Sequence, residues 1–419
     1  MYFSEKVTSL AREAEQALAS RFASIDEISF VNTQKIMDAF REHRVSEGMF
    51  APSSGYGIGD NGRDTLDEIW ADVMDAEAAL VRHNVVSGTH ALAIGLFALL
   101  RPGDVMYSIA GKPYDTLEEV IGISGEDAGN GSLRDFGVDY MQTDLLPDGS
   151  FQIEEIQRNL KENKRVKIVF IQRSKGYLNR KTLSVSEIGA AVKAVKAVAP
   201  DVYVVVDNCY GEFVETREPT AVGADLIIGS LIKNPGGGMA ESGGYFAGTK
   251  RAVELVSYRQ TCVGIGAEQG ATLGQTKSMY KGLFYAPHTV AQAIKTAHLA
   301  AYMFEKLGYG VEPHWSETRY DIIQTVLTGS AKRLCAFCRG IQAGSPVDSF
   351  VTPEPWAMPG YSDQVIMAAG GFTQGSSIEL SADGPLREPY TAFFQGGLTY
   401  ESGKIGIMSA AQAVLDLEG

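Results

Sequence analysis

Two apolar stretches decide how this chain folds: VYVVV at Val202–Val206, which runs directly into Asp207, and ADLIIGS at Ala224–Ser230, which precedes Lys233. Both stretches are short and rich in branched apolar residues, as in strands that are buried on both faces of a parallel sheet. A glycine-rich segment follows at Pro235–Gly238. In open α/β sheets the chemistry gathers at the carboxyl ends of the strands. The pattern therefore predicts that Asp207 and Lys233 lie at one edge of a sheet.

A carboxylate and an amine at such an edge are the two groups that pyridoxal phosphate requires. The lysine would form a Schiff base, and the aspartate would keep the pyridine nitrogen protonated so that the ring accepts electrons. The alternative is a surface lysine and a helix-capping aspartate, which is the commoner role of either residue alone. The neighbouring loops favour the cofactor interpretation for Lys233 and Asp207.

The segment VVSGTH at Val85–His90 stands before a predicted helix. Ser87, Gly88 and Thr89 would present backbone N–H groups at the helix amino terminus, where anions bind readily. The alternative is that the same sequence is an ordinary Ser or Thr N-cap. Together with the strand-end residues, this loop is the predicted site for the cofactor phosphate, and the hydroxyl of Ser230 is a further donor.

Two aromatic side chains are candidates for stacking on the pyridine ring. Tyr114, in GKPYDT, follows the predicted strand VMYSI, so its loop would lie at the carboxyl edge. The phenol could also serve as an acid. A buried tyrosine with structural hydrogen bonds is the alternative. His90 is the second candidate because it follows the phosphate loop.

An amino-acid substrate requires an arginine whose guanidinium forms two parallel hydrogen bonds with the carboxylate. Arg387, in SADGPLREPY, and Arg173, in FIQRSKGY, are the candidates. Most arginines are surface residues, so both assignments have a structural alternative.

Other motifs are given no function. GIGDNG at Gly57–Gly62 has the letters of a dinucleotide-binding loop but lacks the hydrophobic strand that must precede it. Cys335 and Cys338 have no second pair to complete a zinc site. The six histidines show no metal-binding spacing, so no metal is predicted. Cys209 is interpreted as a packing residue.

Composition limits the classes of partner. The formal net charge of −14 argues against nucleic acid and anionic membranes, since both require a basic face. No apolar stretch reaches the roughly 18 residues of a membrane span. Four cysteines in 419 residues do not form a disulfide framework, so the expected location is the reducing cytoplasm.

Short apolar runs alternate with helical stretches between Val85 and Ile228, which predicts a parallel sheet covered by helices on both faces. A helix is expected at Asp64–Leu80, because Leu66, Ile69, Val73 and Leu80 have helical spacing, and another at His288–Leu307. The expected domains are a helical segment at 1–50, a large α/β cofactor-binding domain at 51–290, and an α+β domain at 291–419.

These motifs resemble a known family. The chain is similar to the pyridoxal-phosphate enzymes of fold type I, and most of all to the methionine γ-lyase-like or aluminium-resistance proteins, which are relatives of the cystathionine lyases. The resemblance covers nearly the whole chain and rests on these segments: GYGIGDNGRDTLDEI, SGTHAL, RPGD, GKPYDTLEEVIGI, VDNCYGEF, GSLIKNPGGG, APH, FCRGIQ, MPGY, GSSIELSADGPLREPY and QGGLTYE.

The resemblance implies a mostly parallel, seven-stranded sheet and a smaller carboxy-terminal α+β domain. It implies pyridoxal phosphate, with Lys233 as the Schiff-base lysine, Asp207 on the pyridine nitrogen and Tyr114 on the ring. Phosphate ligands would include Gly88, Thr89 and Ser230.

The resemblance further implies that Tyr56 reaches the cofactor of a neighbouring subunit, so a homodimer is the minimum assembly and a tetramer is expected. The arginine that accompanies this tyrosine in the better-known lyases is replaced by Ile58, and Arg63 is the candidate substitute. The asparagine near the cofactor hydroxyl has no clean match in QRSKGYLN, which begins at Gln172.

The expected activity is elimination of a sulfur group from the β or γ carbon of an amino acid. The alternatives are an aldolase or aminotransferase that uses the same cofactor, and a non-catalytic protein that binds it.

Overall fold

The computed structural model describes residues 3–124, 129–178, 180–358 and 363–417. Of the motifs named above, MPGY lies outside the described residues beyond Met358. The chain forms two compact units. The larger comprises Gln34–Leu231 and Ala240–Lys281, and the smaller comprises Met1–Thr33, Ile232–Met239 and Gly282–Gly419.

The larger unit contains a seven-stranded sheet with the order β1-β7-β6-β5-β4-β2-β3. Pairing is parallel from β6 through β5, β4 and β2 to β3, whereas β7 runs antiparallel to both of its neighbours. The mostly parallel, seven-stranded sheet expected from the sequence is therefore confirmed. The strands are β1 (Ala78–Arg82), β2 (Val105–Ser108), β3 (Asp139–Gln142), β4 (Val166–Gln172), β5 (Tyr203–Asp207), β6 (Leu226–Ser230) and β7 (Gly244–Gly248).

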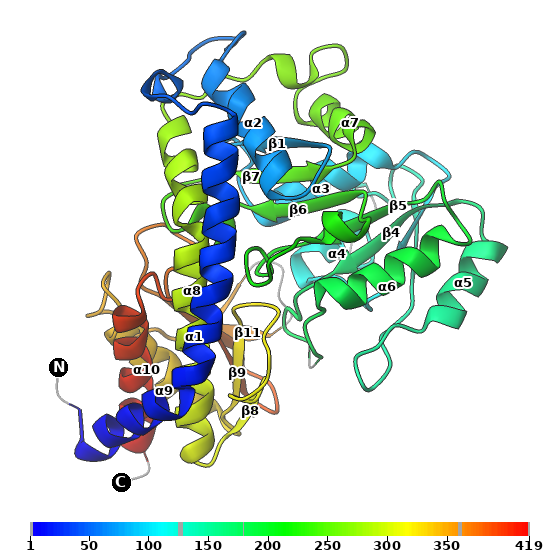
Figure 1. The fold of residues 1–419 in the computed structure, drawn as a ribbon. Coiled ribbons are helices and arrows are strands. Elements are labelled where there is room, and N and C mark those ends of the chain that lie inside the picture. The colour runs from blue at the N-terminus through cyan, green and yellow to red at the C-terminus, as the bar shows by residue number, and fades with distance from the viewer. Residues whose placement is uncertain (1–2, 125–128, 179, 359–362, 418–419) are drawn as a thin grey trace. The chain divides into compact units, whose positions relative to one another are not determined.

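Helices cover both faces of this sheet (Figure 1). One face packs on α3 (Gly88–Leu99), α4 (Asp115–Ile121) and α7 (Lys250–Gln260), whose apolar residues join one core with Phe170 and Val205 of the sheet. The other face carries α2 (Asn61–Val73), whose Trp70 packs on Tyr245 of β7 with ring centroids 4.8 Å apart, together with α5 (Ile153–Glu162) and α6 (Val185–Lys196). Because side chains of a strand alternate between faces, burial on both sides explains the continuous apolar runs of β4 to β6.

The prediction of a helix at Asp64–Leu80 is wrong at the carboxyl end of the helix. The helix α2 ends at Val73, Asp75 has a φ of 51°, and Leu80 lies in β1. Leu80 lies seven positions after Val73, which is a helical spacing, but a buried strand presents an apolar residue there as readily as a helix does. The amino end of α2 is set by Asp60, whose carboxylate accepts a hydrogen bond from the N–H of Arg63 at 2.9 Å.

The smaller unit is built on a six-stranded antiparallel sheet with the order β10-β11-β12-β13-β9-β8. Helices α9 (Ala331–Ala343) and α10 (Tyr400–Leu415) pack on it, and the first turns of α1 (Glu5–Glu42) complete the core through residues such as Val7 and Leu18. The long helix α8 (Thr276–Lys306) contributes Leu299 and Phe304. The strands are β8 (Gly310–Glu312), β9 (Gln324–Leu327), β10 (Trp356–Ala357), β11 (Gln364–Ala369), β12 (Ser381–Pro385) and β13 (Thr391–Gln395).

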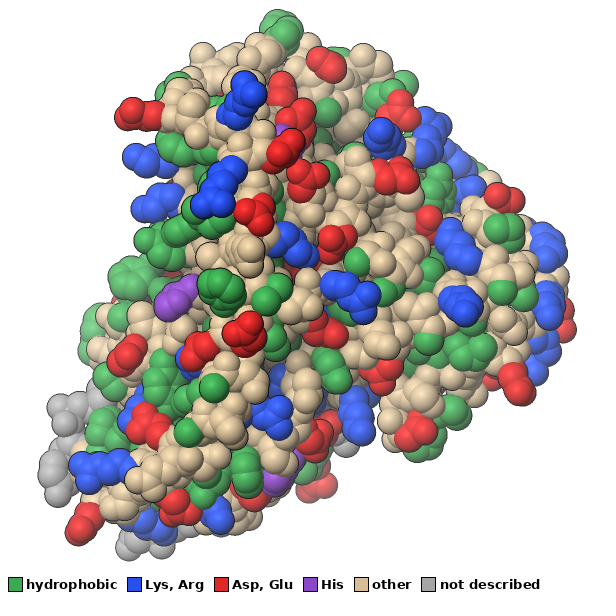
Figure 2. Space-filling view, viewed as in Figure 1, with side chains coloured by type: hydrophobic (Ala, Val, Ile, Leu, Met, Phe, Trp, Pro, Cys, Tyr) green, Lys and Arg blue, Asp and Glu red, His purple; other side chains and the backbone are tan. Residues whose placement is uncertain are grey.

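Acidic and basic side chains are interspersed on the face shown in Figure 2. Within the described ranges, none of the helices combines the length and apolar character that a bilayer crossing demands.

The packing of α9 on α10 generates a stability prediction. A Cβ atom at Gly340 would lie 2.5 Å from the Cα of Ala410, a backbone atom that cannot turn aside. We therefore expect Gly340→Ala to lower the free energy of unfolding by about 1–3 kcal/mol, despite the higher helix propensity of alanine. Urea denaturation followed by circular dichroism measures this difference.

Gly48→Ala is the matched control, because a Cβ there meets only the Oγ of Ser46 at 3.9 Å. Equal stability of the Gly340→Ala and Gly48→Ala proteins would contradict the close packing of α9 on α10.

Candidate active site

Three side chains meet at the carboxyl edge of the sheet in the larger unit. The strands β4, β5 and β6 end at Gln172, Asp207 and Ser230. Gln172 pairs with Asp207, which in turn pairs with Ile228, two residues before Ser230. Paired residues share a face, so all three side chains project on the face that α3 covers.

Asp207 is held by the turn that follows it. Its side chain is 7% exposed, and Oδ1 accepts a hydrogen bond from the N–H of Cys209 at 3.1 Å. The backbone on either side is tied to the flanking strands, because the N–H of Arg173 donates to Asp207 O and the N–H of Asn208 donates to Ile228 O. The carboxylate therefore has a fixed position at the end of a central strand.

The amino terminus of α3 lies on the same face. Ser87 caps the helix, since its Oγ accepts a hydrogen bond from the N–H of His90 at 3.0 Å. Gly88 and Thr89 occupy the first turn, where N–H groups have no intrahelical acceptor, so they suit an anion. The side chain of Ser87 thus has the capping role, while the backbone of the turn can hold phosphate. The Oγ1 atoms of Thr89 and Thr116 lie 2.6 Å apart.

Ser230, at the end of β6, has a hydroxyl that is free to bind an anion. Its side chain is fully buried, and among the described residues its Oγ has no hydrogen-bond partner. A buried hydroxyl without a partner loses its hydration and gains nothing in return. An anion beside Ser230 would supply the missing hydrogen bond.

Tyr114 precedes α4 and is half-buried. Its ring lies 5.9 Å from that of Tyr177, between centroids, and a Cβ at Gly176 would come within 2.9 Å of its Cδ2. The glycine therefore makes room for the ring. The ring of His90 is anchored differently, because its Nδ1 accepts a hydrogen bond from the N–H of Val86 at 3.2 Å.

Lys233 stands three residues beyond β6 and is half-buried. It begins the short helix Asn234–Gly236, within the segment Ile232–Met239 that belongs to the smaller unit. Glycines let this segment approach α8: Gly237 has a φ of 54°, and a Cβ on it would lie 2.5 Å from the carbonyl oxygen of Gly282. The glycine-rich sequence after the lysine therefore serves close packing of the loop on α8.

The guanidinium of Arg173 is hydrogen-bonded to side chains of the protein. Its guanidinium is fully buried and donates to Asn208 Oδ1 at 2.8 Å, to Glu215 Oε2 at 2.7 Å and to Glu218 Oε2 at 3.4 Å. Burial raises the pKa of Glu218, and the positive charge of Arg173 opposes that rise. These bonds tie Arg173 to the segment that follows β5. Arg387, in the smaller unit, is half-exposed and donates to Asp363 at 3.0 Å.

Arg63 is buried and Tyr56 is exposed at the loop that precedes α2. The side chain of Arg63 is 2% exposed, and its Nη1 donates to the carbonyls of Gly57 at 2.8 Å and Gly270 at 3.0 Å. The side chain of Tyr56 is 73% exposed, while its carbonyl accepts a hydrogen bond from the N–H of Gly270. Arg63 thus shapes the loop from inside, and Tyr56 projects from it.

Sequence reasoning missed Gln172, whose amide is buried at the end of β4 beside Asp207. Its place at the end of a predicted strand was the available signal.

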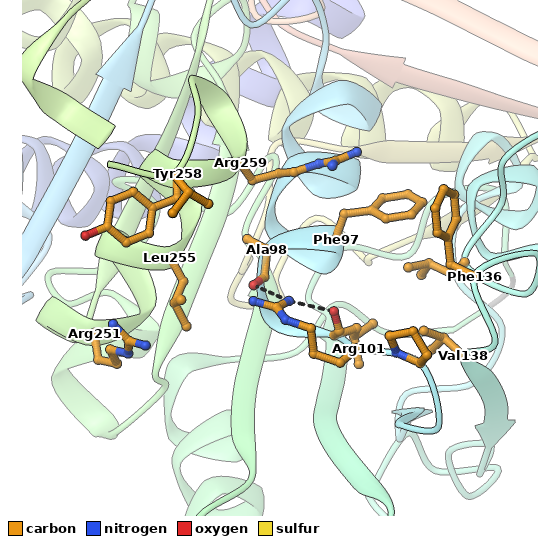
Figure 3. A pocket seen from close by; sticks show the side chains of 13 residues that line it. Phe97, Ala98, Arg101, Phe136, Val138, Arg251, Leu255, Tyr258 and Arg259 are labelled. Atoms are coloured by element: carbon orange, nitrogen blue, oxygen red, sulfur yellow. Dashed lines mark hydrogen bonds between the residues drawn. The ribbon is translucent and has the colours of Figure 1, made fainter. Parts of the chain in front are cut away.

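A pocket of about 590 Å³ opens at the other end of α3 (Figure 3). Phe97, Phe136 and Leu255 line it together with the arginines 101, 251 and 259. Its residues come from the carboxyl end of α3, from α7 and from the segments before β2 and β3, so it lies away from the strand ends where Asp207 and Ser230 stand. Among the described residues, no group of three or more His, Cys, Asp or Glu could hold a metal ion.

Pyridoxal phosphate fits the residues at the carboxyl edge. The phosphate would satisfy the Oγ of Ser230 and the first-turn N–H groups of α3, and Asp207 provides a fixed carboxylate for the pyridine nitrogen.

Comparisons with known proteins found relatives over nearly the whole chain. The family described as methionine gamma-lyase matches residues 7–415. The chain is 50% identical to the uncharacterised protein YnbB of Bacillus subtilis, over 98% of this chain and 97% of the relative. A carbon–sulfur lyase involved in aluminium resistance from Clostridium novyi is 51% identical, with a TM-score of 0.94 over 97% of this chain and 96% of that one.

The fold extends to more distant proteins. The pyridoxal-5′-phosphate-dependent protein YhfS of Escherichia coli superposes with a TM-score of 0.62 at 16% identity, over 92% of this chain and 96% of that one. A mixed sheet flanked by helices, with a smaller antiparallel domain, is the architecture of fold type I. With the match over residues 7–415, the chain belongs to the methionine γ-lyase family.

Proposed function

We propose that the protein is a pyridoxal-phosphate-dependent lyase that breaks the carbon–sulfur bond of an amino acid. The observation that carries the proposal is the carboxyl edge of the sheet. Asp207 is fixed there, the buried Oγ of Ser230 has no partner within the described part of the chain, and Lys233 follows three residues later. The family match and the Clostridium novyi relative support the choice of carbon–sulfur chemistry.

Each residue has one task in this proposal. When bound, pyridoxal phosphate withdraws electrons from the substrate α-carbon. The carboxylate of Asp207 holds the proton on the pyridine nitrogen. Lys233 Nζ would hold the cofactor and would take the α-proton of the substrate as a general base, a contribution of roughly 10²–10⁴-fold in rate. The phenol of Tyr114, or that of Tyr56, protonates the departing sulfur, which leaves with the electron pair of the broken bond.

The phosphate would be held by the first turn of α3, at Gly88 and Thr89, and by Ser230. His90 and Tyr114 remain the two proposed ring contacts. We propose Arg387 for the substrate carboxylate, because the guanidinium of Arg173 is already occupied by Asn208, Glu215 and Glu218.

We further propose that the protein acts as a homo-oligomer, with a dimer as the minimum and a tetramer as the expected assembly. The support is Tyr56, a large aromatic side chain that a buried arginine holds outward. Its phenol would meet the cofactor of a second copy, whereas Arg63 would support the loop and not touch phosphate, since its donors reach carbonyls of its own subunit.

The same cofactor could instead support a retro-aldol reaction or a transamination. Products separate these activities, since elimination followed by hydrolysis releases a 2-oxo acid together with ammonia. A protein that binds the cofactor without turnover would leave every amino acid unchanged.

The first prediction concerns the reaction. Adding sulfur amino acids such as cystathionine, cysteine and methionine to the purified holoenzyme should change its visible spectrum and yield a 2-oxo acid, ammonia and a thiol, or hydrogen sulfide from cysteine, in equal amounts. Spectral titration followed by product assays tests this outcome. No thiol from any sulfur amino acid, together with transfer of the amino group to an added 2-oxo acid or release of an aldehyde from a β-hydroxy amino acid, would replace the lyase with one of the alternatives.

The second prediction concerns Lys233. Borohydride reduction of the holoenzyme should attach the cofactor to the peptide that contains Lys233, and Lys233→Ala should abolish that adduct, because the variant has no amine there. Peptide mass mapping reads the result. Lys250→Ala, at the start of α7, is the control and should retain the adduct. Attachment that persists in the Lys233→Ala protein refutes the assignment.

The third prediction concerns Ser230. Because its Oγ has no partner among the described residues, Ser230→Ala should not lower the stability of the cofactor-free protein, since it removes a buried hydroxyl that forms no hydrogen bond there. It should weaken cofactor binding roughly 10- to 100-fold, as expected for one hydrogen bond to a charged group. Reconstitution titrations and urea unfolding measure the two effects.

Ser108→Ala, at the end of β2, is the contrasting variant. The Oγ of Ser108 donates to the carbonyl of Gly111 at 2.6 Å, so this change should cost stability. Unchanged cofactor affinity in Ser230→Ala would remove Ser230 from the phosphate site.

A further inference from the structure

The pocket of Figure 3 lies in the larger unit at the amino edge of the sheet, where α3 ends and β2 and β3 begin. Its volume of about 590 Å³ is within the range of sites that bind small molecules, roughly 300–1,000 Å³. Phe97 and Phe136 form an aromatic wall, with ring centroids 5.6 Å apart and an interplanar angle of 88°. Leu133, Val138 and Leu255 extend the apolar lining. The pocket can therefore take the apolar body of a small molecule.

The charged side chains that line this pocket are all arginines. Arg101, Arg251 and Arg259 stand around it, and none of the described lining residues is Asp or Glu. This local excess of positive charge occurs in a chain whose formal net charge is −14. Charge complementarity therefore favours a ligand that carries negative charge.

Two of the three guanidiniums already have partners. Arg101 Nη1 donates to the carbonyls of Ala98 at 2.9 Å and Leu100 at 2.7 Å, at the end of α3. Arg251 Nη1 lies 2.6 Å from Glu254 Oε2, so a carboxylate neutralises it. Arg101 thus adds positive charge to the pocket, whereas Arg251 adds little.

Arg259 is the best placed of the three to bind an anion. Its guanidinium lies over the ring of Phe97, with the central carbon 5.0 Å from the ring centroid (Figure 3). The side chain is exposed, and no ion pair of Arg259 is found within the described ranges. A guanidinium that rests on an aromatic face can still donate two parallel hydrogen bonds to a carboxylate.

We propose that this pocket binds a small organic carboxylate with an apolar body. Arg259 holds the carboxylate, and the apolar body lies against Phe97 and Phe136. The site is separate from the proposed active site, because Asp207 and Ser230 end their strands at the opposite, carboxyl edge of the sheet. It therefore goes beyond the proposed function and does not depend on it.

The test compares two probes of the same shape that differ in charge. Purified holoenzyme is titrated by calorimetry with naphthalene-2-carboxylate and with naphthalene-2-carboxamide, its uncharged counterpart. The wild-type protein should prefer the carboxylate, and added salt should reduce this preference because Arg259 is exposed. Arg259→Met should weaken binding of the carboxylate roughly three- to fivefold more than binding of the amide, as expected for one exposed ion pair.

Three further variants complete the experiment. Phe136→Ala should weaken binding of both probes alike, because the ring contributes apolar contact and no charge. Arg259→Lys keeps the charge and should keep part of the preference for the carboxylate. Arg12→Met, at an exposed position of α1 in the smaller unit, is the control and should change neither affinity.

Equal affinities of the wild-type protein for the two probes would overturn the proposal, and so would an unchanged preference in Arg259→Met or unchanged affinities in Phe136→Ala. A wild-type protein that binds neither probe would overturn it as well, which is the outcome expected if a second copy of the chain covers the pocket. None of these outcomes bears on the proposed lyase, which the spectral titration with sulfur amino acids tests.

Discussion

The parallel pairing of β4, β5 and β6 is the constraint on which the site depends. Because the strands run in one direction, their last residues lie at one edge, and because side chains alternate, residues in register share one face. Gln172, Asp207 and Ser230 are therefore brought together by backbone hydrogen bonds that involve none of their side chains. The amino terminus of α3 packs on the same face, so a helix dipole and a fixed carboxylate are available to one ligand.

The sequence predicted the centre of the sheet well because burial on both faces leaves a strong apolar signal, as in Val204–Val206. Its margins were harder to recognise. The edge strand β3 is largely exposed, and β1 continues an apolar spacing that a helix shares. The same contrast applies to the candidate site residues. Asp207 and Ser230 could be predicted from their place at strand ends. The partners of Arg173 and Arg63 could not, because they depend on turns and loops whose course no local pattern records.

The buried side chains around Arg173 hold the turn that follows β5 and Asp207. The turn after β5 contains Tyr210 and Phe213 at positive φ, of 73° and 60°, which is costly for side chains of this size. Glu218 binds the N–H of Phe213 at 2.9 Å and the amide of Asn208 at 2.9 Å, and Arg173 compensates its charge. Removing one member would leave an uncompensated buried charge, so the group holds the turn, and with it Asp207, as a unit.

Arg63 illustrates how an arginine in the loop of Tyr56, which is proposed to reach the cofactor, need not itself be a phosphate ligand. Its Nη1 and Nη2 reach carbonyls from two separate loops, and Asp64 neutralises it at 2.8 Å through Nε. An arginine released to bind an anion would leave those buried carbonyls unsatisfied, at a cost comparable to the bond gained. The arrangement of lower free energy keeps the guanidinium inside the loop, and the exposed Tyr56 is then the residue proposed to contact the cofactor. Replacement of the neighbouring arginine by Ile58 is compatible with this division, because Ile58 is itself exposed and apolar and so suits contact with another protein surface better than contact with phosphate.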